Sequence, residues 1–170
     1  MTTSFPFPHA ELTKIHGKPS AATIKQLKRE VFANLREIHS DLGGGNHGYL
    51  GLALPTGQYV ILAGQPFVAP VHPGPLPVYP AGTTGPAITS GNRTYDRNLE
   101  QFRTYSDVKN AVRKQIMAAV EPRYYQELEN DIMGYADVTI LQLLQHLIRT
   151  YGTLSTTELE ANRSKLSEQW

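Results

Sequence analysis

Residues 99–120 read LEQFRTYSDVKNAVRKQIMAAV, and their apolar side chains recur at steps of three and four. The members of this stripe are Leu99, Phe102, Tyr105, Val108, Val112, Ile116 and Val120. An α-helix turns once in about 3.6 residues, so this spacing places them all on one face. The pattern therefore predicts a long amphipathic helix, which we expect to begin near Thr89 or Ser90.

A second stripe of the same kind lies upstream. Its members are Ile24, Leu27, Val31, Leu35, Ile38 and Leu42. Thr23 and Gln26 have the spacing of a capping box at its start, and Ser20 is a rival N-cap. Gly43-Gly44-Gly45 should end this helix, because glycine accepts the left-handed backbone of a C-terminal cap. Residues 1–19 have three prolines and no periodicity, which indicates an extended N-terminal arm.

Downstream of residue 120 the sequence predicts shorter helices. Pro122 can begin one, since its missing N–H is not needed in a first turn. Thr139 and Gln142 form a capping box for a helix that Gly152 ends, and its apolar residues are Leu141, Leu144, Leu147, Ile148 and Tyr151. Ser155 and Glu158 form a third box before a last, mostly polar helix. We expect a mainly α fold, with about five helices in one domain over residues 20–170.

The two long stripes flank an uncharged insert. Residues 42–92 contain no Asp, Glu, Lys or Arg, but hold eleven of the fourteen glycines and eight of the twelve prolines. Residues 49–62 predict either a short β-hairpin or, in the second half, a helical turn. Residues 66–86 hold seven prolines and predict a semi-rigid extended loop.

The insert is also rich in aromatic residues, unlike a solvated disordered segment. Tyrosine is enriched where proteins meet. The aromatic residues of the insert therefore become candidates for a contact between copies, and two leucines of the last helix join them. The complete predicted interface is Tyr49, Tyr59, Phe67, Tyr79, Leu159 and Leu166.

Enzymatic chemistry finds little support in the sequence. There is no cysteine, which excludes disulfides, thiolate metal sites and cysteine nucleophiles. The glycine-rich run Gly43–Gly51 lacks the lysine and hydroxyl residue of a phosphate-binding loop. His39, Asp41 and His47 form the best candidate for metal or acid–base chemistry, and a capped helix end with solvated imidazoles explains them as well. We predict no catalytic residue, no metal and no cofactor.

Charge leaves a second hypothesis open. The chain carries a net charge of only +1, but residues 1–40 sum to +3, residues 93–123 to +3 and residues 124–170 to −4. A helical nucleic-acid-binding or protein-interaction module would use the basic residues of the two long helices, Lys25, Lys28, Arg29, Arg36, Lys109, Arg113 and Lys114. No apolar run approaches the ~20 residues of a membrane span, and residues 1–8 lack the pattern of a secretory signal, so we expect a cytoplasmic protein.

Several segments, taken in order, resemble the Gag-like polyprotein of copia-type LTR retrotransposons. Gly17-Lys18-Pro19 precedes KREVFANLREIHS (28–40), which leads into GGGNHGYLGLAL (43–54). After the proline-rich loop come FRTYSDV (102–108) and KQIMAAVEPRYYQELEN (114–130). DVTILQLLQHLIRTYG (137–152) and LSTTELEANRSKL (154–166) complete the resemblance.

This resemblance implies a structural function. Gag proteins of this family assemble into a shell that packages the RNA of the element, and their capsid region is helical. The chain would correspond to the N-terminal capsid half, with copies of itself as partner. RNA would be bound weakly or through a downstream region, because the sequence has no Cys/His zinc knuckle. No catalytic residue carries over.

Overall fold

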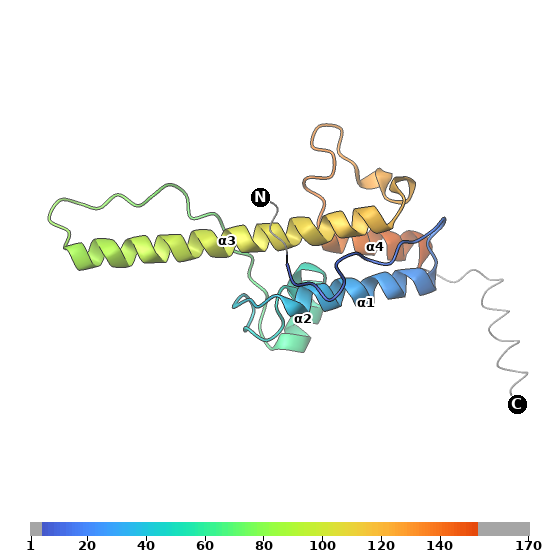
Figure 1. Cartoon of the computed structure of the whole chain (residues 1–170), viewed down its shortest axis with the longest axis horizontal. Helices are drawn as coiled ribbons and strands as arrows, with labels where there is room; N and C mark the ends of the chain where they lie inside the picture. The colour runs from blue at the N-terminus through green and yellow to red at the C-terminus, as the bar shows by residue number, and fades with distance from the viewer. Residues whose placement is uncertain (1–4, 153–170) are drawn as a thin grey trace, which may run out of the picture.

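The computed structural model describes residues 5–152 and is mainly α-helical, as the sequence predicts. Figure 1 shows α1, α2 and α4 gathered around one half of the long helix α3, whose other half extends away from them. The described residues form no strand, and their one isolated β-bridge joins Asn130 to Gly134. The elements are α1 (Ala21–Glu37), η1 (Leu50–Leu52), α2 (Thr56–Ala63), α3 (Gly85–Ala119), η2 (Pro122–Tyr124), η3 (Gln126–Leu128) and α4 (Ile140–Tyr151), where η marks a 3₁₀ helix.

Helix α1 begins after Ser20, the alternative N-cap, and ends earlier than the sequence predicts. Ser20 is the N-cap, and Thr23 occupies the third helical position, where its hydroxyl accepts from the Ser20 N–H at 2.8 Å. The expected box of Thr23 with Gln26 is therefore wrong. The helix stops at Glu37 rather than at the triple glycine. The chain turns back there, and the Tyr49 N–H donates to the carbonyl of Leu35 at 2.9 Å.

Gly48 makes this return possible. Its φ is +52°, a left-handed conformation that favours glycine. A Cβ at this position would lie 2.5 Å from the carbonyl oxygens of Leu35 and Ile38. The backbone can approach the end of α1 this closely only without a side chain.

Helix α3 begins earlier than its apolar stripe predicts. Thr84 is the N-cap, and its hydroxyl accepts from the Ala87 N–H at 3.3 Å. Pro86 lies in the first turn, where a missing N–H has no consequence. The expected start at Thr89 or Ser90 was wrong because capping, rather than burial, determines where this helix begins.

The β-hairpin considered for residues 49–62 does not form. This segment instead contains η1 and α2, so the helical alternative is correct for its second half. Pro55, with φ −57°, precedes α2, and Gly64, with φ +81°, ends it. Both residues favour a helix boundary, and of the α2 residues only Tyr59 is buried.

The remaining caps follow the sequence. Thr139 and Gln142 make both hydrogen bonds of the predicted capping box, at 2.9 and 3.0 Å, and Gly152 caps the end of α4. Pro122 begins a helix, although one of the 3₁₀ type. The predicted last helix, with the box of Ser155 and Glu158, lies outside the described residues.

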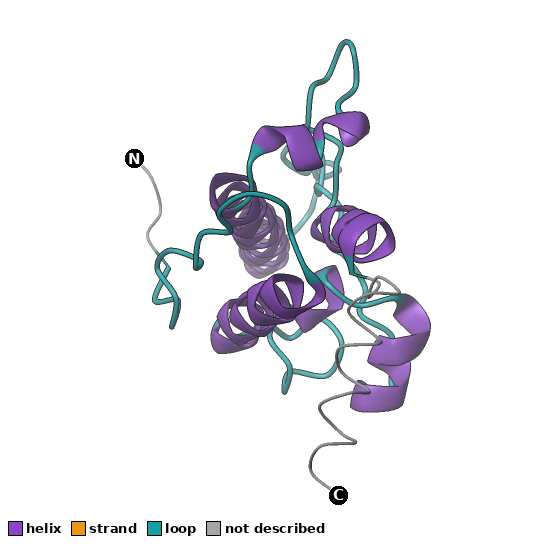
Figure 2. Ribbon diagram, turned by 90° about the vertical axis from the view of Figure 1, so that its right-hand side faces the viewer, coloured by secondary structure: helices purple, strands orange, loops and turns teal. Residues whose placement is uncertain are grey.

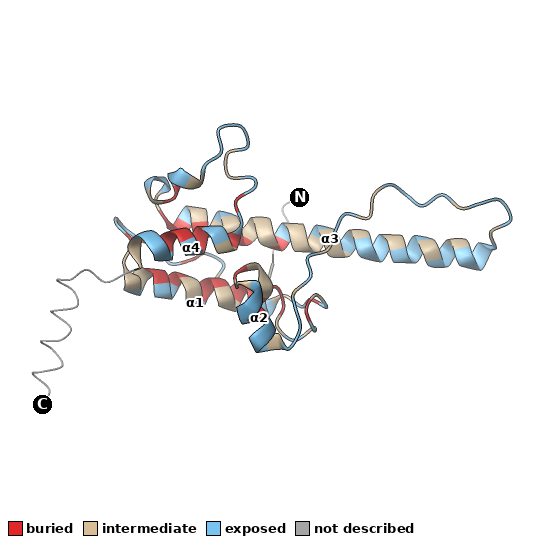
Figure 3. Cartoon of the chain, turned by 180° about the vertical axis from the view of Figure 1, so that it is seen from behind, coloured by how far each residue is buried: buried red, intermediate tan, exposed pale blue. Residues whose placement is uncertain are grey.

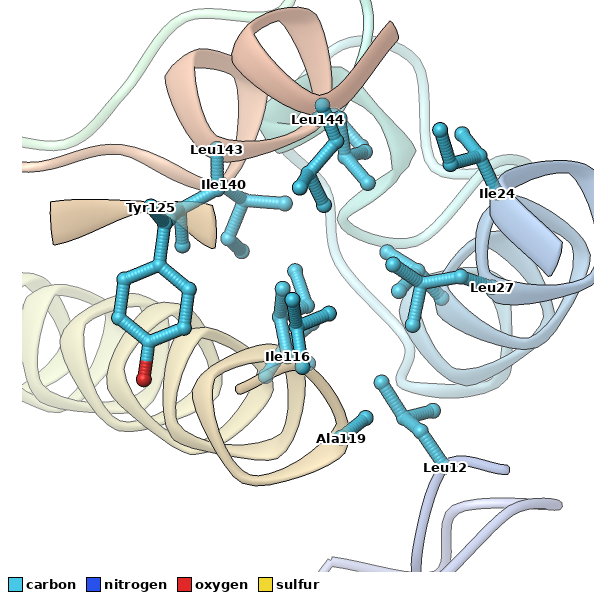
Figure 4. Close-up of a cluster of buried hydrophobic side chains, with 14 of the residues drawn as sticks. Leu12, Ile24, Leu27, Ile116, Ala119, Tyr125, Ile140, Leu143 and Leu144 are labelled. Carbon is cyan, nitrogen blue, oxygen red and sulfur yellow. The ribbon is translucent and has the colours of Figure 1, made fainter. Parts of the chain in front are cut away.

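One core joins α1, α4 and the C-terminal half of α3. Figure 4 shows the side chains of these helices converging between the ribbons. Burying each large aliphatic side chain contributes about 1.5–3 kcal/mol before conformational entropy is counted. The aliphatic residues of these three helices with at most 2% exposure are Ile24, Leu27, Val31 and Leu35 of α1, Val108, Val112 and Ile116 of α3, and Ile140, Leu143, Leu144 and Leu147 of α4.

The N-terminal arm is part of this body. Residues 5–19 contain no helix, yet Leu12 and Ile15 are each only 6% exposed and belong to the core. The Ile15 N–H donates to the carbonyl of Ala119 at 2.8 Å. The buried carboxylate of Glu30 accepts from both the N–H and the hydroxyl of Thr13, each at 2.9 Å. Polar side chains of α1 thus fix the extended arm in place.

Candidate interaction surfaces

The proline-rich segment, residues 66–84, runs beside the protruding half of α3 (Figure 1). Three contacts hold it there. The Tyr95 hydroxyl donates to the carbonyl of Gly74 at 2.8 Å. The Tyr79 hydroxyl donates to Asn92 Oδ1 at 2.9 Å, and the rings of His72 and Phe102 meet edge to face at 5.2 Å. The proline-rich segment and residues 85–104 of α3 therefore form one projecting unit, which we call the projection.

An aromatic cluster joins this projection to the body. The ring of Phe67 lies 6.4 Å from Tyr49, 5.7 Å from Tyr59 and 6.5 Å from Tyr105. The Tyr59 hydroxyl donates to the carbonyl of Gly43 at 2.8 Å, and burial raises the pKa of this hydroxyl above its ordinary value. A Cβ on Gly51 would collide with Phe67, so this glycine makes room for the cluster. The base of the projection is thus closely packed.

Two of the four aromatic residues predicted for an interface are internal. Tyr49 is 2% exposed and Tyr59 is 1% exposed, so neither forms part of the outer surface. Phe67 and Tyr79 are half-buried against the cluster and α3. Large aromatic side chains bury much apolar area, and Tyr49 and Tyr59 use it to attach the uncharged insert to its own domain. An interface role for Phe67 and Tyr79 stays a prediction. Leu159 and Leu166 lie outside the described residues.

Aliphatic residues form the exposed apolar surface of the insert instead. Ile61 is 87% exposed, and it lies about 200° around α2 from the buried Tyr59. Figure 3 shows α2 and the protruding half of α3 largely in the colour of exposed residues. We call the following set the apolar insert surface: Ile61, Leu62, Val68, Val71, Leu76 and Val78, which are 51–94% exposed. Predicting a helix over residues 56–63 would have placed Ile61 and Leu62 on the exposed face of that helix.

Gly91 sets how closely the proline-rich segment approaches α3. A Cβ there would collide with the Tyr79 hydroxyl and lie 2.9 Å from its ring. Gly91→Ala should displace Tyr79 and break its hydrogen bond to Asn92, although alanine favours the helix by about 1 kcal/mol. We expect the nuclear Overhauser contacts between the Tyr79 ring and Asn92 to disappear, while thermal stability is kept or rises.

Gly85→Ala is the matched control for this prediction. It adds the same methyl group to the same helix, where nothing lies within 4 Å. This variant should keep the contacts between Tyr79 and Asn92. Retention of these contacts in Gly91→Ala would contradict the role assigned to Gly91.

The predicted nucleic-acid-binding residues have different neighbours. Lys25, Lys28 and Arg29 line a groove between α1 and α4, and Arg36 is exposed near the end of α1. On α3, Lys109 lies 5.3 Å from the centre of the Tyr105 ring, and Arg113 donates to the carbonyl of Ala136 at 2.8 Å. Lys114 is exposed. Lys25, Lys28 and Arg29 thus line one groove, although Lys28 lies 5.7 Å from the centre of the Phe32 ring, and Lys109 and Arg113 are engaged with their own domain.

The histidine cluster is open to solvent. His39 Nε2 lies 3.2 Å from Asp41 Oδ1, and their side chains are 77% and 83% exposed. His47 packs edge to face on Tyr59 at 6.3 Å instead of joining them. Within residues 5–152 no group of three His, Cys, Asp or Glu side chains could hold a metal ion. The cluster thus pairs a single histidine with a single carboxylate.

No protein-family model, curated protein or solved structure matches this chain. Of the helices in the described part, none combines the length and hydropathy required to cross a membrane.

Proposed function

We propose that the chain is a structural, Gag-type capsid subunit that assembles with copies of itself into a shell around retroelement RNA in the cytoplasm. The apolar insert surface is the observation that carries this proposal. It presents six large aliphatic side chains to solvent, within a stretch of fifty-one residues that has no formal charge. Large apolar side chains that are exposed along one uncharged stretch of a chain are candidates for a place of association.

The order of segments that resembles Gag proteins supports a second copy as the partner. An uncharged surface fits another copy of itself, because it creates no repulsion between like charges. The aromatic cluster adds a rigid base, so the projection can be presented without first being ordered, which lowers the entropic cost of association. We propose no enzymatic activity.

The test replaces the most exposed residues of α2 and measures assembly. Ile61→Lys with Leu62→Lys should leave the fold intact, because these side chains are 87% and 51% exposed and cations are favoured in the last turn of a helix. Wild type should form defined oligomers or shells in light scattering and electron microscopy across protein concentration and salt. The double variant should remain monomeric with an unchanged melting temperature.

Ile132→Lys serves as the control, since Ile132 is 90% exposed and lies outside the insert. It should assemble as wild type does. A wild-type protein that stays strictly monomeric at high concentration contradicts the proposed function. Normal assembly of the α2 variant contradicts the assignment of the apolar insert surface. Deleting residues 66–86 would be a poorer test, because it also removes Phe67 and the Thr84 cap.

A further inference from the structure

The proline-rich segment contains one pattern twice, in which two prolines are separated by two other residues. The first copy of the pattern is APVHP (69–73), and the second copy is LPVYP (76–80). A polyproline II helix has three residues per turn, so in that conformation the two prolines of each copy lie on the same edge. Protein grooves that recognise polyproline II segments bind prolines with this spacing. Both copies therefore have the sequence of such a ligand.

The second copy is restricted to the polyproline II conformation by its own residues. The rings of Pro77 and Pro80 fix the φ angles of these two residues. Leu76 and Tyr79, which precede them, are kept out of the α-helical region by a steric clash with the proline rings. Among the described residues, no backbone–backbone hydrogen bond involves residues 66–79, which agrees with a conformation that has no internal hydrogen bonds. The backbone of the second copy is thus largely fixed without secondary structure.

The two copies differ in how far their prolines are covered. Pro70 and Pro73 of the first copy are half-buried. Pro77 and Pro80 of the second copy are exposed, and Val78 between them is 94% exposed. The edge that carries both prolines is therefore open to a partner in the second copy and partly covered in the first.

Two hydrogen bonds hold the second copy on α3. The Tyr95 hydroxyl donates to the carbonyl of Gly74, just before the copy begins, at 2.8 Å. Near its end, the Tyr79 hydroxyl donates to Asn92 Oδ1 at 2.9 Å. A segment that is already ordered loses less conformational entropy on binding than a flexible one. The second copy is therefore held in advance in the form that a groove would bind.

We propose that residues 76–80 are the binding site for a different protein, whose groove is lined by aromatic side chains and recognises polyproline II. In such grooves the prolines pack against aromatic rings, and the preformed backbone of the ligand keeps the entropic cost low. The groove carries no charge at this contact, because residues 42–92 have no formal charge and would leave a buried charge without a partner. An uncharged aromatic groove is the complement of Pro77, Val78 and Pro80.

A different protein fits this site better than a second copy of the chain does. Five grooves on the described part of the chain each contain at most one Phe, Tyr or Trp side chain. Recognition of polyproline II uses a groove lined by several such rings. The site also lies beside the protruding half of α3 (Figure 1), whereas the self-association proposed above is tested on α2. The contact therefore goes beyond the proposed assembly.

The test measures binding of the full chain to a panel of purified WW domains and proline-binding Src-homology domains by isothermal titration. At least one domain of the panel should bind the wild-type protein. Pro77→Ala with Pro80→Ala should weaken this binding by about tenfold or more, because it removes both outward rings and loosens the backbone. A wild-type protein that binds no domain of the panel would overturn the proposal.

The first copy of the pattern supplies the matched control. Pro70→Ala with Pro73→Ala makes the same two changes in the same segment, but at prolines that are half-buried. This variant should bind the domain as wild type does. Equal weakening in the two double variants, each with the circular dichroism of the folded protein, would overturn the assignment to the second copy. Retention of binding by Pro77→Ala with Pro80→Ala would do so as well.

The hydrogen bond between Tyr79 and α3 gives a second measurement. Asn92→Ala removes the acceptor of the Tyr79 hydroxyl and leaves the sequence of the segment unchanged. The loosened segment must then be ordered on binding, so the affinity should fall by about threefold. Tighter binding would show that the partner draws the Tyr79 ring away from α3, contrary to the orientation on which this proposal depends.

Assembly and this contact can fail separately. Ile61→Lys with Leu62→Lys, which should prevent assembly, should bind the domain as wild type does, because these residues lie on α2. A strictly monomeric wild-type protein that binds the domain would contradict the proposed function and support this site. Shells whose subunits bind no domain of the panel would support the proposed function and contradict this site.

Discussion

Replacing Ile116 by alanine should lower the free energy of unfolding by about 2–5 kcal/mol, the usual range for removing a large aliphatic side chain from a core. Ile116 is fully buried, and Figure 4 shows its side chain directed from α3 toward the residues of α1 and α4. The helices contact one another pairwise, so a cavity here weakens all three contacts. Urea unfolding followed by circular dichroism gives the free energy directly.

Ile132→Ala is the control for the cavity at Ile116. It deletes the same atoms from a side chain that is 90% exposed, and should change stability by less than about 0.5 kcal/mol. The two isoleucines differ in that Ile116 is buried in the core and Ile132 is exposed. Equal losses of stability in the two variants would therefore contradict the location of the core.

Asn34→Ala should cause the next largest loss in the free energy of unfolding. This loss should come from broken hydrogen bonds as well as from the removed volume. Asn34 is fully buried and holds the N-terminal arm in place. Its Oδ1 accepts from the His9 N–H at 2.9 Å, and its Nδ2 donates to the His9 carbonyl at 2.9 Å and to Gln115 Oε1 at 3.0 Å. Gln115 also donates to the His9 carbonyl, so in Asn34→Ala the groups that lose their partner are the His9 N–H and Gln115 Oε1. An unsatisfied buried donor costs about 1–3 kcal/mol, and because the bond of the His9 N–H is part-buried we expect a loss of about 1 kcal/mol, at the lower end of this range.

Two measurements distinguish the loss of this contact from general destabilisation. In Asn34→Ala the His9 amide should exchange with solvent much faster than in wild type, and the unfolding free energy should fall by the stated amount. Asn98→Ala makes the same change on an exposed helical surface and should affect neither quantity. An unchanged His9 exchange rate in Asn34→Ala would show that Asn34 does not hold the arm.

Much of this fold can be predicted from the sequence, because the spacing of apolar residues in a helix indicates which of its faces is buried. The stripes of residues 24–35 and 108–116 became the buried faces of α1 and α3. The Thr139 cap could also be predicted, since both partners of its box are local in sequence. The end of α1 could not, because it depends on the return of Gly48 and Tyr49 to the helix, a contact with residues about a dozen positions away.

The direction of the apolar side chains in the insert was harder to predict, for a related reason. The composition predicts that the apolar groups of the insert are covered, and its aromatic residues predict a contact with a partner. Tyr59 instead packs within the domain, which leaves Ile61 outside. Whether a given apolar side chain faces inward depends on the local conformation, and this segment is too short for periodicity to distinguish a helix from a strand. The polar contacts of Asn34 with the arm join residues distant in sequence and carry no local signal.

The length of α3 affects how the size of this protein will be judged in solution. Its 35 residues span about 52 Å, whereas a compact chain of this length has a radius of gyration of about 15 Å and hence a diameter near 40 Å. Figure 2 looks along this helix and shows the other elements packed around it. Because the projection adds friction but little mass, a monomer will sediment slowly and elute early from a sizing column. A dimer assigned by elution volume alone could therefore be a single chain.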